Sequence, residues 1–418
     1  MQEYQIPWGQ WYEQSTRTLT FPDNWDVRYC SMQKLAPMTE AQIMDKIDHP
    51  IGTEPLEVLA KGKKSACIIM DDISRPTPGS LLLPMIIQKL AACGIAYENI
   101  KVLMALGGHR PMTRQEMQIK VGSWVLDHVQ VLNHSPHSAD LVTIPDAEQT
   151  IKINKHFMDA DLRIAVGCIV PHTLAGFSGG AKAVIPGIGG LETLYENHTL
   201  VFADRSAGMS FKTSTCDPDN PMRQNMEQIV GKVGLDFILN VVLNDEMKVA
   251  DAFAGHFVKA HRQACQRAME ALQTPIVPDA DIICCSAFPK DTEYSQIATC
   301  FAVLGHYKER SVKKDGTIVA MTASSEGPGF HALFGPGMRL FSPHDDNMPP
   351  LELKGTETHI YSEGVTQIDI RQFYTGEVPV INHDWNSILE KLIKKYEGKT
   401  PLVAIYPMGA IQIGALKE

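Results

Sequence analysis

Long apolar runs are missing from this sequence. None approaches the roughly 18 consecutive apolar residues that a membrane span needs, and the N-terminal residues Met-Gln-Glu-Tyr-Gln-Ile-Pro-Trp lack the basic flank and apolar segment of a secretion signal. A basic stripe is missing too, since 38 Lys and Arg against 48 Asp and Glu give a net charge of -10. We therefore expect a cytoplasmic protein with neither a membrane nor a nucleic acid as partner.

Paired cysteine motifs are also absent. The nine cysteines are odd in number, never form Cys-x-x-Cys, and mostly lie inside apolar runs such as Asp281-Ile-Ile-Cys-Cys. This pattern is typical of reduced thiols packed in a cytosolic core.

What the sequence does contain is the composition of a large folded globular protein, with 44% hydrophobic and 21% charged residues over 418 positions. Short β-rich runs alternate with amphipathic stretches, which predicts an α/β fold with mostly parallel sheets flanked by helices. We expect strands near 65–70, 100–106, 162–170, 282–285, 317–321, 359–361 and 402–406, and helices near 81–93, 225–233 and 256–272.

A chain of this length usually forms two domains. The segment 273–279, Gln-Thr-Pro-Ile-Val-Pro-Asp, carries two prolines after a helical pattern and is the best linker. We predict an N-terminal domain at 1–273 that binds the cofactor, a C-terminal α/β domain at 274–418 that contributes substrate-binding residues, and an active site in the cleft between them. The strand near 402–406 could join either sheet.

The first candidate site is Asp71-Asp-Ile-Ser-Arg-Pro-Thr-Pro, which leaves an apolar strand and enters an amphipathic helix. Its prolines fix the turn, while Ser74, Thr77 and the start of the helix offer hydroxyl and N–H donors to an anion. With Arg75 beside them, this segment predicts a phosphate or carboxylate cradle. The alternative is a capped helix with a surface arginine.

A second segment, Leu106-Gly-Gly-His-Arg-Pro-Met-Thr, also follows a strand. Its two glycines let the backbone approach a ligand closely, and His109 is then exposed where it can act as a general acid or base near neutral pH. The alternative is a histidine that satisfies loop carbonyls.

The longest polar segment, 167–190, is rich in glycine without repeat character. So many glycines indicate backbone that approaches a bound group, with Ser178 and the amides of Gly179 and Gly180 as donors. The strongly functional side chains are His172 and Lys182. Desolvation among small neighbours lowers the pKa of a lysine and suits it to a covalent or charge-stabilising role, whereas a solvated lysine on a glycine-rich surface loop is the alternative.

Downstream, an apolar helical face predicts an inward-pointing histidine. The face is formed at i, i+3, i+4 and i+7 by Leu191, Leu194, Tyr195 and His198. Such a histidine is often only a hydrogen-bonded core residue. No second histidine at i+4 or carboxylate set accompanies it, so any metal there needs ligands from outside the protein.

Three further polar segments are weaker candidates. Asn133-His-Ser-Pro-His offers two histidines in a loop that could bind a metal, although such a segment is usually a polar turn. Pro289-Lys-Asp-Thr-Glu-Tyr-Ser-Gln and Glu326-Gly-Pro-Gly follow strands of the second domain and could close over a site. Both could equally be ordinary strand-to-helix turns.

Together these segments resemble the lactate racemase family, whose members use a nickel-pincer nucleotide. The resemblance spans most of the chain and rests on the order and spacing of three motifs. They are Asp72-Ile-Ser-Arg-Pro-Thr-Pro, Gly108-His-Arg-Pro-Met-Thr and Pro171-His-Thr-Leu-Ala-Gly-Phe-Ser-Gly-Gly-Ala-Lys, with His198 sixteen residues beyond Lys182.

The resemblance implies an isomerase that inverts C2 of a 2-hydroxy acid by reversible hydride transfer. Its cofactor would be pyridinium-3,5-bisthiocarboxylic acid mononucleotide, which holds Ni(II) through sulfur, carbon and sulfur. Lys182 would bind the cofactor covalently through a thio-acyl arm, and His198 would complete a tetragonal set suited to Ni(II). His109 and His172 would be the paired acid and base that handle the hydroxyl proton while a planar 2-oxo acid forms and is reduced on its opposite face.

By the same resemblance, the nucleotide is bound by Asp72, Ile73, Ser74 and Arg75, with Arg75 close to phosphate or substrate. The implied partners are a small 2-hydroxy acid and the cofactor-biosynthesis proteins. For the oligomeric state we expect a homodimer.

One segment departs from the family pattern. Members that act on lactate have a Tyr-Gln pair followed shortly by Lys after the first strand of the second domain, whereas this sequence has Ser295, Gln296 and Thr299. Loss of a cation near the substrate carboxylate weakens lactate binding. We therefore expect these three residues to bind a different 2-hydroxy acid, such as a larger or sugar-derived one.

Two other classes of function are compatible with the same segments. One is a non-catalytic phosphate- or nucleotide-binding protein that keeps the glycine-rich segment. The other is a 2-hydroxy acid oxidoreductase of the same fold that uses an ordinary nicotinamide nucleotide. Against the second, no Gly-x-Gly-x-x-Gly follows the first strand.

Overall fold

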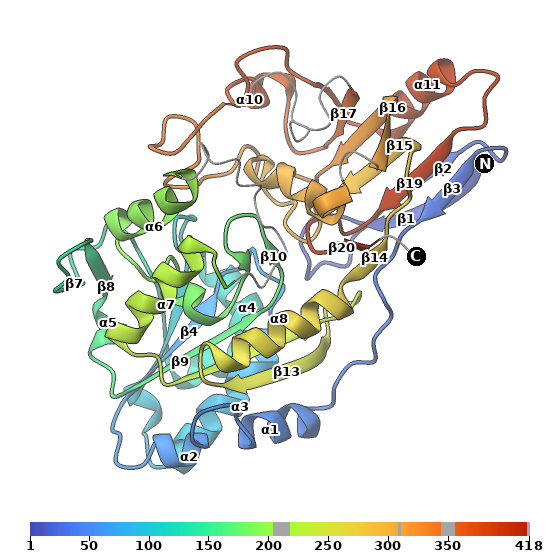
Figure 1. Cartoon of the computed structure of the whole chain (residues 1–418). Coiled ribbons are helices and arrows are strands. Elements are labelled where there is room, and N and C mark those ends of the chain that lie inside the picture. The colour runs from blue at the N-terminus through green and yellow to red at the C-terminus, as the bar shows by residue number, and fades with distance from the viewer. Residues whose placement is uncertain (204–217, 308–310, 344–355, 416–418) are drawn as a thin grey trace. The chain divides into compact units, whose positions relative to one another are not determined.

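The computed structural model describes residues 1–203, 218–307, 311–343 and 356–415. It confirms an α/β fold with mostly parallel sheets flanked by helices (Figure 1). The chain forms two compact units. We call Lys34–Ala271 the middle unit, and Met1–Gln33 with Leu272–Glu418 the terminal unit.

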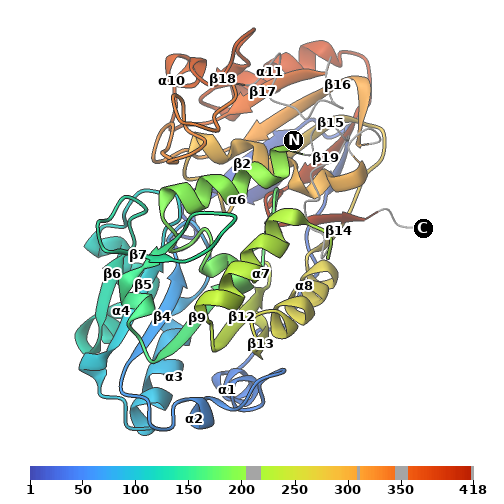
Figure 2. The same cartoon turned by 60° about the vertical axis from the view of Figure 1, so that its left-hand side comes forward.

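The middle unit contains a six-stranded sheet in the order β13-β12-β9-β4-β5-β6, which can be followed strand by strand in Figure 2. β12 and β13 are antiparallel, and the other neighbours are parallel. The strands are β4 (Ala66–Asp71), β5 (Ile100–Ala105), β6 (Gln130–Asn133), β9 (Leu162–Cys168), β12 (Phe237–Leu243) and β13 (Val249–Gly255).

Helices and small hairpins complete the middle unit. The hairpins are β7 (Leu141–Ile144) with β8 (Ile151–Asn154), and β10 (Pro171–His172) with β11 (Gly176–Phe177). The helices are α1 (Glu40–Asp48), α2 (Leu56–Leu59), α3 (Gly79–Ala92), η1 (Tyr97–Asn99), α4 (Arg114–His128), α5 (Lys155–Met158), η2 (Gly180–Ala183), α6 (Leu191–Ala203), α7 (Pro221–Val233) and α8 (Lys259–Ala271). One core cluster joins Ile69 of β4 to Phe157 of α5 and Met226 of α7.

The strand order creates a switch point beside β4. The chain moves outward from β4 to β5 and β6, and then returns to the other side of β4 as β9. The carboxyl ends of β4, β5 and β9 therefore lie at one sheet edge, which is where open parallel sheets bind their ligands.

The terminal unit contains a second six-stranded sheet, in the order β18-β17-β16-β15-β19-β3, and all its neighbouring strands are parallel. The strands are β3 (Asp26–Tyr29), β15 (Ala280–Ser286), β16 (Val312–Met321), β17 (Glu357–Tyr361), β18 (Val380–Asn382) and β19 (Leu402–Tyr406). Outside the sheet are β1 (Gln2–Pro7), β2 (Thr16–Phe21), β14 (Gln273–Pro275), β20 (Ile413–Ala415), η4 (Tyr294–Tyr307), α10 (Gln367–Arg371) and α11 (Trp385–Lys395).

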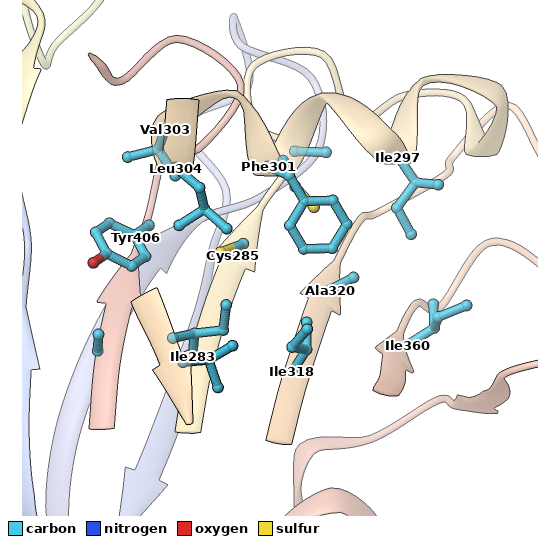
Figure 3. Close-up of a cluster of buried hydrophobic side chains, with 14 of the residues drawn as sticks. Ile283, Cys285, Ile297, Phe301, Val303, Leu304, Ile318, Ala320, Ile360 and Tyr406 are labelled. Atoms are coloured by element: carbon cyan, nitrogen blue, oxygen red, sulfur yellow. The ribbon is translucent and has the colours of Figure 1, made fainter. Parts of the chain in front are cut away.

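Both faces of this sheet are buried, so successive strand residues enter different cores. Ile283 and Cys285 of β15 belong to the cluster that includes Phe301 and Leu304 of η4, which point toward the strands in Figure 3. The intervening Ile282 and Cys284 belong to a second cluster on the opposite face. Continuous apolar strands are typical of parallel sheets covered on both sides.

The second cluster explains where the first 33 residues belong. The sequence assigned them to a domain spanning 1–273, but the structure places them in the terminal unit. β3 pairs with β19 in parallel, and buried Leu19, Phe21 and Trp25 pack against the strand residues of that sheet. Their partners lie far away in the sequence, so local pattern could not reveal them.

The segment 273–279 and the strand at 402–406 also have defined places in the terminal unit. The segment begins with β14, which pairs in parallel with β20. The strand at 402–406 is β19, between β15 and β3.

Two further properties concern the helices and the cysteines. In the part of the chain that the structure describes, no helix combines the length and apolarity required to cross a bilayer. The eight cysteines of that part are all free thiols.

Candidate active site

A carboxylate and an imidazole form a direct pair at the switch point. Asp72 follows β4, His109 follows β5, and His109 Nδ1 lies 2.6 Å from Asp72 Oδ2. Because a carboxylate can only accept, Nδ1–H donates, and a neutral His109 ring then carries its lone pair on Nε2. This is the arrangement by which a carboxylate orients a histidine base.

Charged and polar neighbours keep Asp72 ionised. Its side chain is buried, and burial acts to raise its pKa. His109, Arg75 and Ser74 outweigh that effect and hold the pKa of Asp72 well below its ordinary value. The Ser74 amide donates to Asp72 Oδ1 at 2.9 Å, the Ser74 hydroxyl donates to the same oxygen, and Arg75 Nη1 donates to that hydroxyl at 2.9 Å.

The preceding residue, Asp71, anchors the same loop from the other side of the strand. Lys120 of α4 is fully buried, and its Nζ lies 2.7 Å from Asp71 Oδ1 and donates to the Arg75 carbonyl at 2.6 Å. Thr77 Oγ1 donates to Asp71 Oδ2 at 2.5 Å. The Thr77 hydroxyl, predicted as a donor to an anion, therefore binds the protein's own carboxylate.

His172 is held differently from His109. The half-buried ring belongs to β10, and its Nδ1 accepts hydrogen bonds from the amides of Leu174 at 3.2 Å and Ala175 at 3.1 Å. A neutral His172 therefore carries its proton on Nε2. The ring must leave these two N–H groups before it can hold a second proton, so the two histidines present opposite neutral tautomers.

The glycine-rich segment uses much of its backbone to bind the protein itself. The Gly180 amide donates to Asn240 Oδ1 at 3.0 Å, and the Ser178 hydroxyl donates to the Cys168 carbonyl at 2.6 Å. Gly179 and Gly180 have φ of +77° and +57°, and a Cβ on Gly180 would lie 2.8 Å from the His261 ring. Packing of the segment thus requires these glycines, which the sequence had assigned with Ser178 to ligand binding.

Lys182 lies in η2, directly after this turn, and its side chain is half-buried. Burial lowers the pKa of Lys182 to about 7, and the charges of Arg75 and Arg223 act in the same direction. Asp72 and Asp71 oppose them. A considerable fraction of the amine is therefore neutral at physiological pH, as a nucleophilic lysine requires.

His198 faces inward from α6, as the helical pattern predicts, and is 5% exposed. Its Nδ1 lies 2.6 Å from the Leu194 carbonyl and must donate to it. Burial lowers the pKa of His198 to about 4, and the charge of Lys182 adds to this effect. His198 is therefore neutral with its lone pair on Nε2, which is the state of a metal-binding histidine whose other nitrogen is fixed by a carbonyl.

The histidines of the 133–137 loop do not form such a site. His134 is buried, its Nε2 donates to the Gly189 carbonyl at 2.9 Å, and its Nδ1 accepts from Asn154 at 3.2 Å. Among the described residues, no group of three or more His, Cys, Asp or Glu side chains could hold a metal ion. His134 instead fixes the end of the glycine-rich segment.

The predicted substrate-binding residues belong to the terminal unit. Ser295 Oγ donates to Glu293 Oε2 at 3.1 Å. Within the described chain, Gln296 Nε2 and Thr299 Oγ1 are shielded atoms with no hydrogen-bond partner. The 289–296 and 326–329 loops pair with each other, because Tyr294 N donates to the Gly327 carbonyl at 3.0 Å.

The other predicted site residues gather in the middle unit. Asp72, Ser74, Arg75 and His109 form one hydrogen-bonded group, and Ile73 between them is buried. The loop after β5 touches the glycine-rich segment, since the Gly107 amide donates to the Gly187 carbonyl at 2.9 Å.

Sequence patterns did not identify two buried cations, Lys120 and Arg223. Each lies on the buried face of its helix, Lys120 beside Met117 and Val121, and Arg223 beside Met226. A charged residue on an otherwise apolar helical face was the signal that could have found them, because such a charge needs a partner.

The chain is similar to known proteins along most of its length. A family model described as the lactate racemase N-terminal domain matches residues 12–210. The lactate racemase of Thermoanaerobacterium thermosaccharolyticum is 33% identical over 308 residues, which cover 71% of this chain and 70% of that protein. The lactate racemase of Lactiplantibacillus plantarum is 32% identical over 305 residues, covering 70% and 69%.

Solved structures agree with these likenesses. The lactate racemase apoprotein from T. thermosaccharolyticum matches with a TM-score of 0.75 and 25% identity, over 99% of this chain and all of that one. A Thermotoga maritima protein matches in fold, with a TM-score of 0.68 and 20% identity over 92% of this chain.

The fold and these likenesses define an isomerase of the racemase class. Within that class, the chain belongs to the lactate racemase family.

The pair of fully buried Lys120 and partly buried Asp71 gives a direct test of how the site loop is held. We expect Lys120→Met to lower the free energy of unfolding by about 1–3 kcal/mol, because it removes the cation that pairs with the partly buried Asp71 carboxylate. Adding Asp71→Asn should recover part of that loss. Urea unfolding measures both, with exposed Lys63→Met as the matched control, and equal stability of Lys120→Met and the control would contradict the assignment.

Proposed function

We propose that this chain inverts C2 of a 2-hydroxy acid by reversible hydride transfer to a nickel-pincer nucleotide. The observation that carries the proposal is the state of four side chains in one unit. They are an oriented base, a second histidine of opposite tautomer, a lysine with a lowered pKa and a buried neutral histidine: His109, His172, Lys182 and His198.

The residues present fit such a cofactor. His198 supplies one neutral nitrogen, and the cofactor's own sulfur and carbon atoms would supply the rest of a tetragonal nickel site. Lys182 would hold a thio-acyl arm, and Asp72, Ile73, Ser74 and Arg75 would hold the nucleotide. When bound, the cofactor supplies an acceptor for the C2 hydride and returns it.

The protein's part is to move the hydroxyl proton. His109 accepts it on Nε2, and the adjacent Asp72 carboxylate stabilises the resulting imidazolium. His172 donates a hydrogen bond from Nε2–H to a substrate oxygen, and the proton held by His109 returns to that oxygen when the 2-oxo acid is reduced. Starting from the opposite enantiomer, His172 must first give up its contacts with the Leu174 and Ala175 amides, so the two directions make different demands on the site.

The free thiols of the described chain support a reducing, cytoplasmic location. We propose the same location for the proteins that build the cofactor, which would act on this chain.

Metal and mass analysis tests the cofactor directly. Protein produced together with the cofactor-building enzymes should carry nickel and a covalent adduct whose peptide maps to Lys182. Lys182→Ala should lose the adduct, and His198→Ala should keep the adduct while losing most of the nickel. Exposed Lys248→Ala is the control, and wild-type protein with neither nickel nor adduct would exclude the proposal.

The orientation of His109 by Asp72 predicts a large kinetic effect. Asp72→Asn should lower the racemization rate per bound nickel by about 100-fold or more, since it no longer favours the tautomer with the lone pair on Nε2. Normalising to nickel separates this effect from weaker cofactor binding. Exposed Asp127→Asn should react like wild type, and a rate within a few-fold of wild type for Asp72→Asn would remove Asp72 from this role.

The terminal unit predicts the substrate class. Because Ser295 and Thr299 replace the Tyr and Lys of family members that act on lactate, the loaded enzyme should epimerize a larger polyhydroxy acid such as gluconate at C2 faster than it racemizes lactate. Thr299→Lys should raise kcat/KM for lactate by about tenfold, because a charge-assisted hydrogen bond to the carboxylate returns. The control Ala298→Lys, which changes the exposed neighbouring residue, should not raise kcat/KM for lactate. Equal wild-type rates on lactate and on the best larger acid would refute the assignment of the substrate class.

A further inference from the structure

The first turn of α7 places a buried cation against the segment that joins His172 to Lys182. Arg223 is 3% exposed, and its guanidinium donates to the carbonyls of Ala175 at 3.1 Å, Phe177 and Gly179 at 3.2 Å. One side chain therefore binds three backbone carbonyls within five residues of a single turn.

Two neighbouring side chains extend this support. Asn220, the N-cap of α7, accepts from the Arg223 amide at 3.1 Å and donates to the Leu174 carbonyl at 2.8 Å. His261 of α8 donates from Nε2 to the Ser178 carbonyl at 2.9 Å. Burial lowers the pKa of His261 well below its ordinary value, and Arg223 adds to this effect, so the ring is neutral.

Holding the carbonyls also aims the amides, because each peptide unit is planar and trans, with C=O and N–H on opposite sides. Asn220 binds the Leu174 carbonyl, and the amide on the other side of that same peptide, Ala175 N–H, donates to His172 Nδ1 at 3.1 Å. The support from α7 is therefore transmitted to the orientation of His172.

The same geometry recurs next to Lys182. Arg223 binds the Gly179 carbonyl, while the amide of that peptide, Gly180 N–H, donates to Asn240 Oδ1 at 3.0 Å. The peptide at the start of η2 is thus fixed from both sides, two residues before Lys182.

Arg223 also contributes charge. The pKa of Lys182 is lowered to about 7, mainly by burial and also by the charges of Arg75 and Arg223, against the opposing charges of Asp72 and Asp71. Arg223 differs from Arg75 in that its guanidinium binds backbone carbonyls in the segment that leads to Lys182.

We propose that Arg223 is a positioning residue of this site, which fixes the turn between His172 and Lys182 and sets a permanent positive charge that acts on the Lys182 amine. The proposal rests on the proposed function and deepens it, since it concerns what positions Lys182, the residue proposed to bind the cofactor, and what keeps its amine neutral. It can be measured on protein made without the cofactor.

The first experiment follows acetylation of Lys182 by N-acetoxysuccinimide from pH 5 to 10, with peptide mass spectrometry and exposed Lys248 as internal reference. Wild type should show a midpoint near 7. Arg223→Met and Arg223→Gln should each move the midpoint up by about one pH unit, whereas Arg223→Lys should stay near wild type because it keeps the charge. The control is Arg267→Met, which removes a partly exposed arginine of α8 paired with Asp251.

The second experiment separates carbonyl binding by the Arg223 guanidinium from the effect of its positive charge. Arg223→Lys cannot bind three carbonyls in the planar geometry of a guanidinium, so after production with the cofactor-building enzymes it should carry several-fold less adduct than wild type. A wild-type Lys182 midpoint in folded Arg223→Gln would overturn the charge effect, and full adduct in Arg223→Lys would overturn the positioning effect. Absence of adduct in wild type would instead count against the proposed function, because the acetylation profile does not depend on the cofactor.

Discussion

The site depends on the parallel pairing of β4 with both β5 and β9. In that register Asp71 lies opposite Ala105 of β5, and Met70 lies opposite Val166 of β9. Neighbouring strand residues point to opposite faces, so Asp71 reaches Lys120 of α4 while the next residue, Asp72, reaches His109. A slip of one residue would turn each carboxylate to the opposite face and away from its partner, Lys120 or His109.

Burying so many charges in one place is possible because each is compensated in a specific way. Asp71 and Asp72 have direct partners in Lys120 and His109, whereas Arg223 is held mainly through backbone carbonyls. Several of these charges act together on the pKa of the Lys182 amine. Desolvation together with net positive surroundings favours its neutral form, and the same desolvation keeps His198 neutral.

The two histidines illustrate how backbone and side chain achieve different chemistry with one residue type. A carboxylate fixes His109 with its lone pair on Nε2, and two amides fix His172 with its proton there. The amides belong to a turn whose carbonyls are bound by α7 and α8. The orientation of His172 thus depends on residues about 50 to 90 positions away in the chain.

Local sequence sufficed wherever the determining interactions are local. Apolar runs ending in Asp, Gly or His predicted the strands and the edge that carries Asp72 and His109, and a helical repeat predicted that His198 faces inward. Local sequence could not assign Lys120 or Arg223, because their partners lie in distant segments. Lys120 pairs with the Asp71 side chain and the Arg75 carbonyl, and Arg223 binds backbone carbonyls of the glycine-rich segment. The glycines at 179 and 180 were attributed to a ligand because their close neighbours, Asn240 and His261, are distant in sequence. The predicted domain assignment of the first 33 residues was wrong for the same reason, since β3 pairs with the distant strand β19.

The fate of the C2 hydrogen tests the central claim most directly. A 2-hydroxy acid carrying deuterium at C2 should be racemized by the loaded enzyme in ordinary water with the deuterium retained in both enantiomers, because hydride leaves and returns without meeting solvent. Loss of deuterium at the rate of racemization would show that a proton is exchanged at C2, and would contradict hydride transfer.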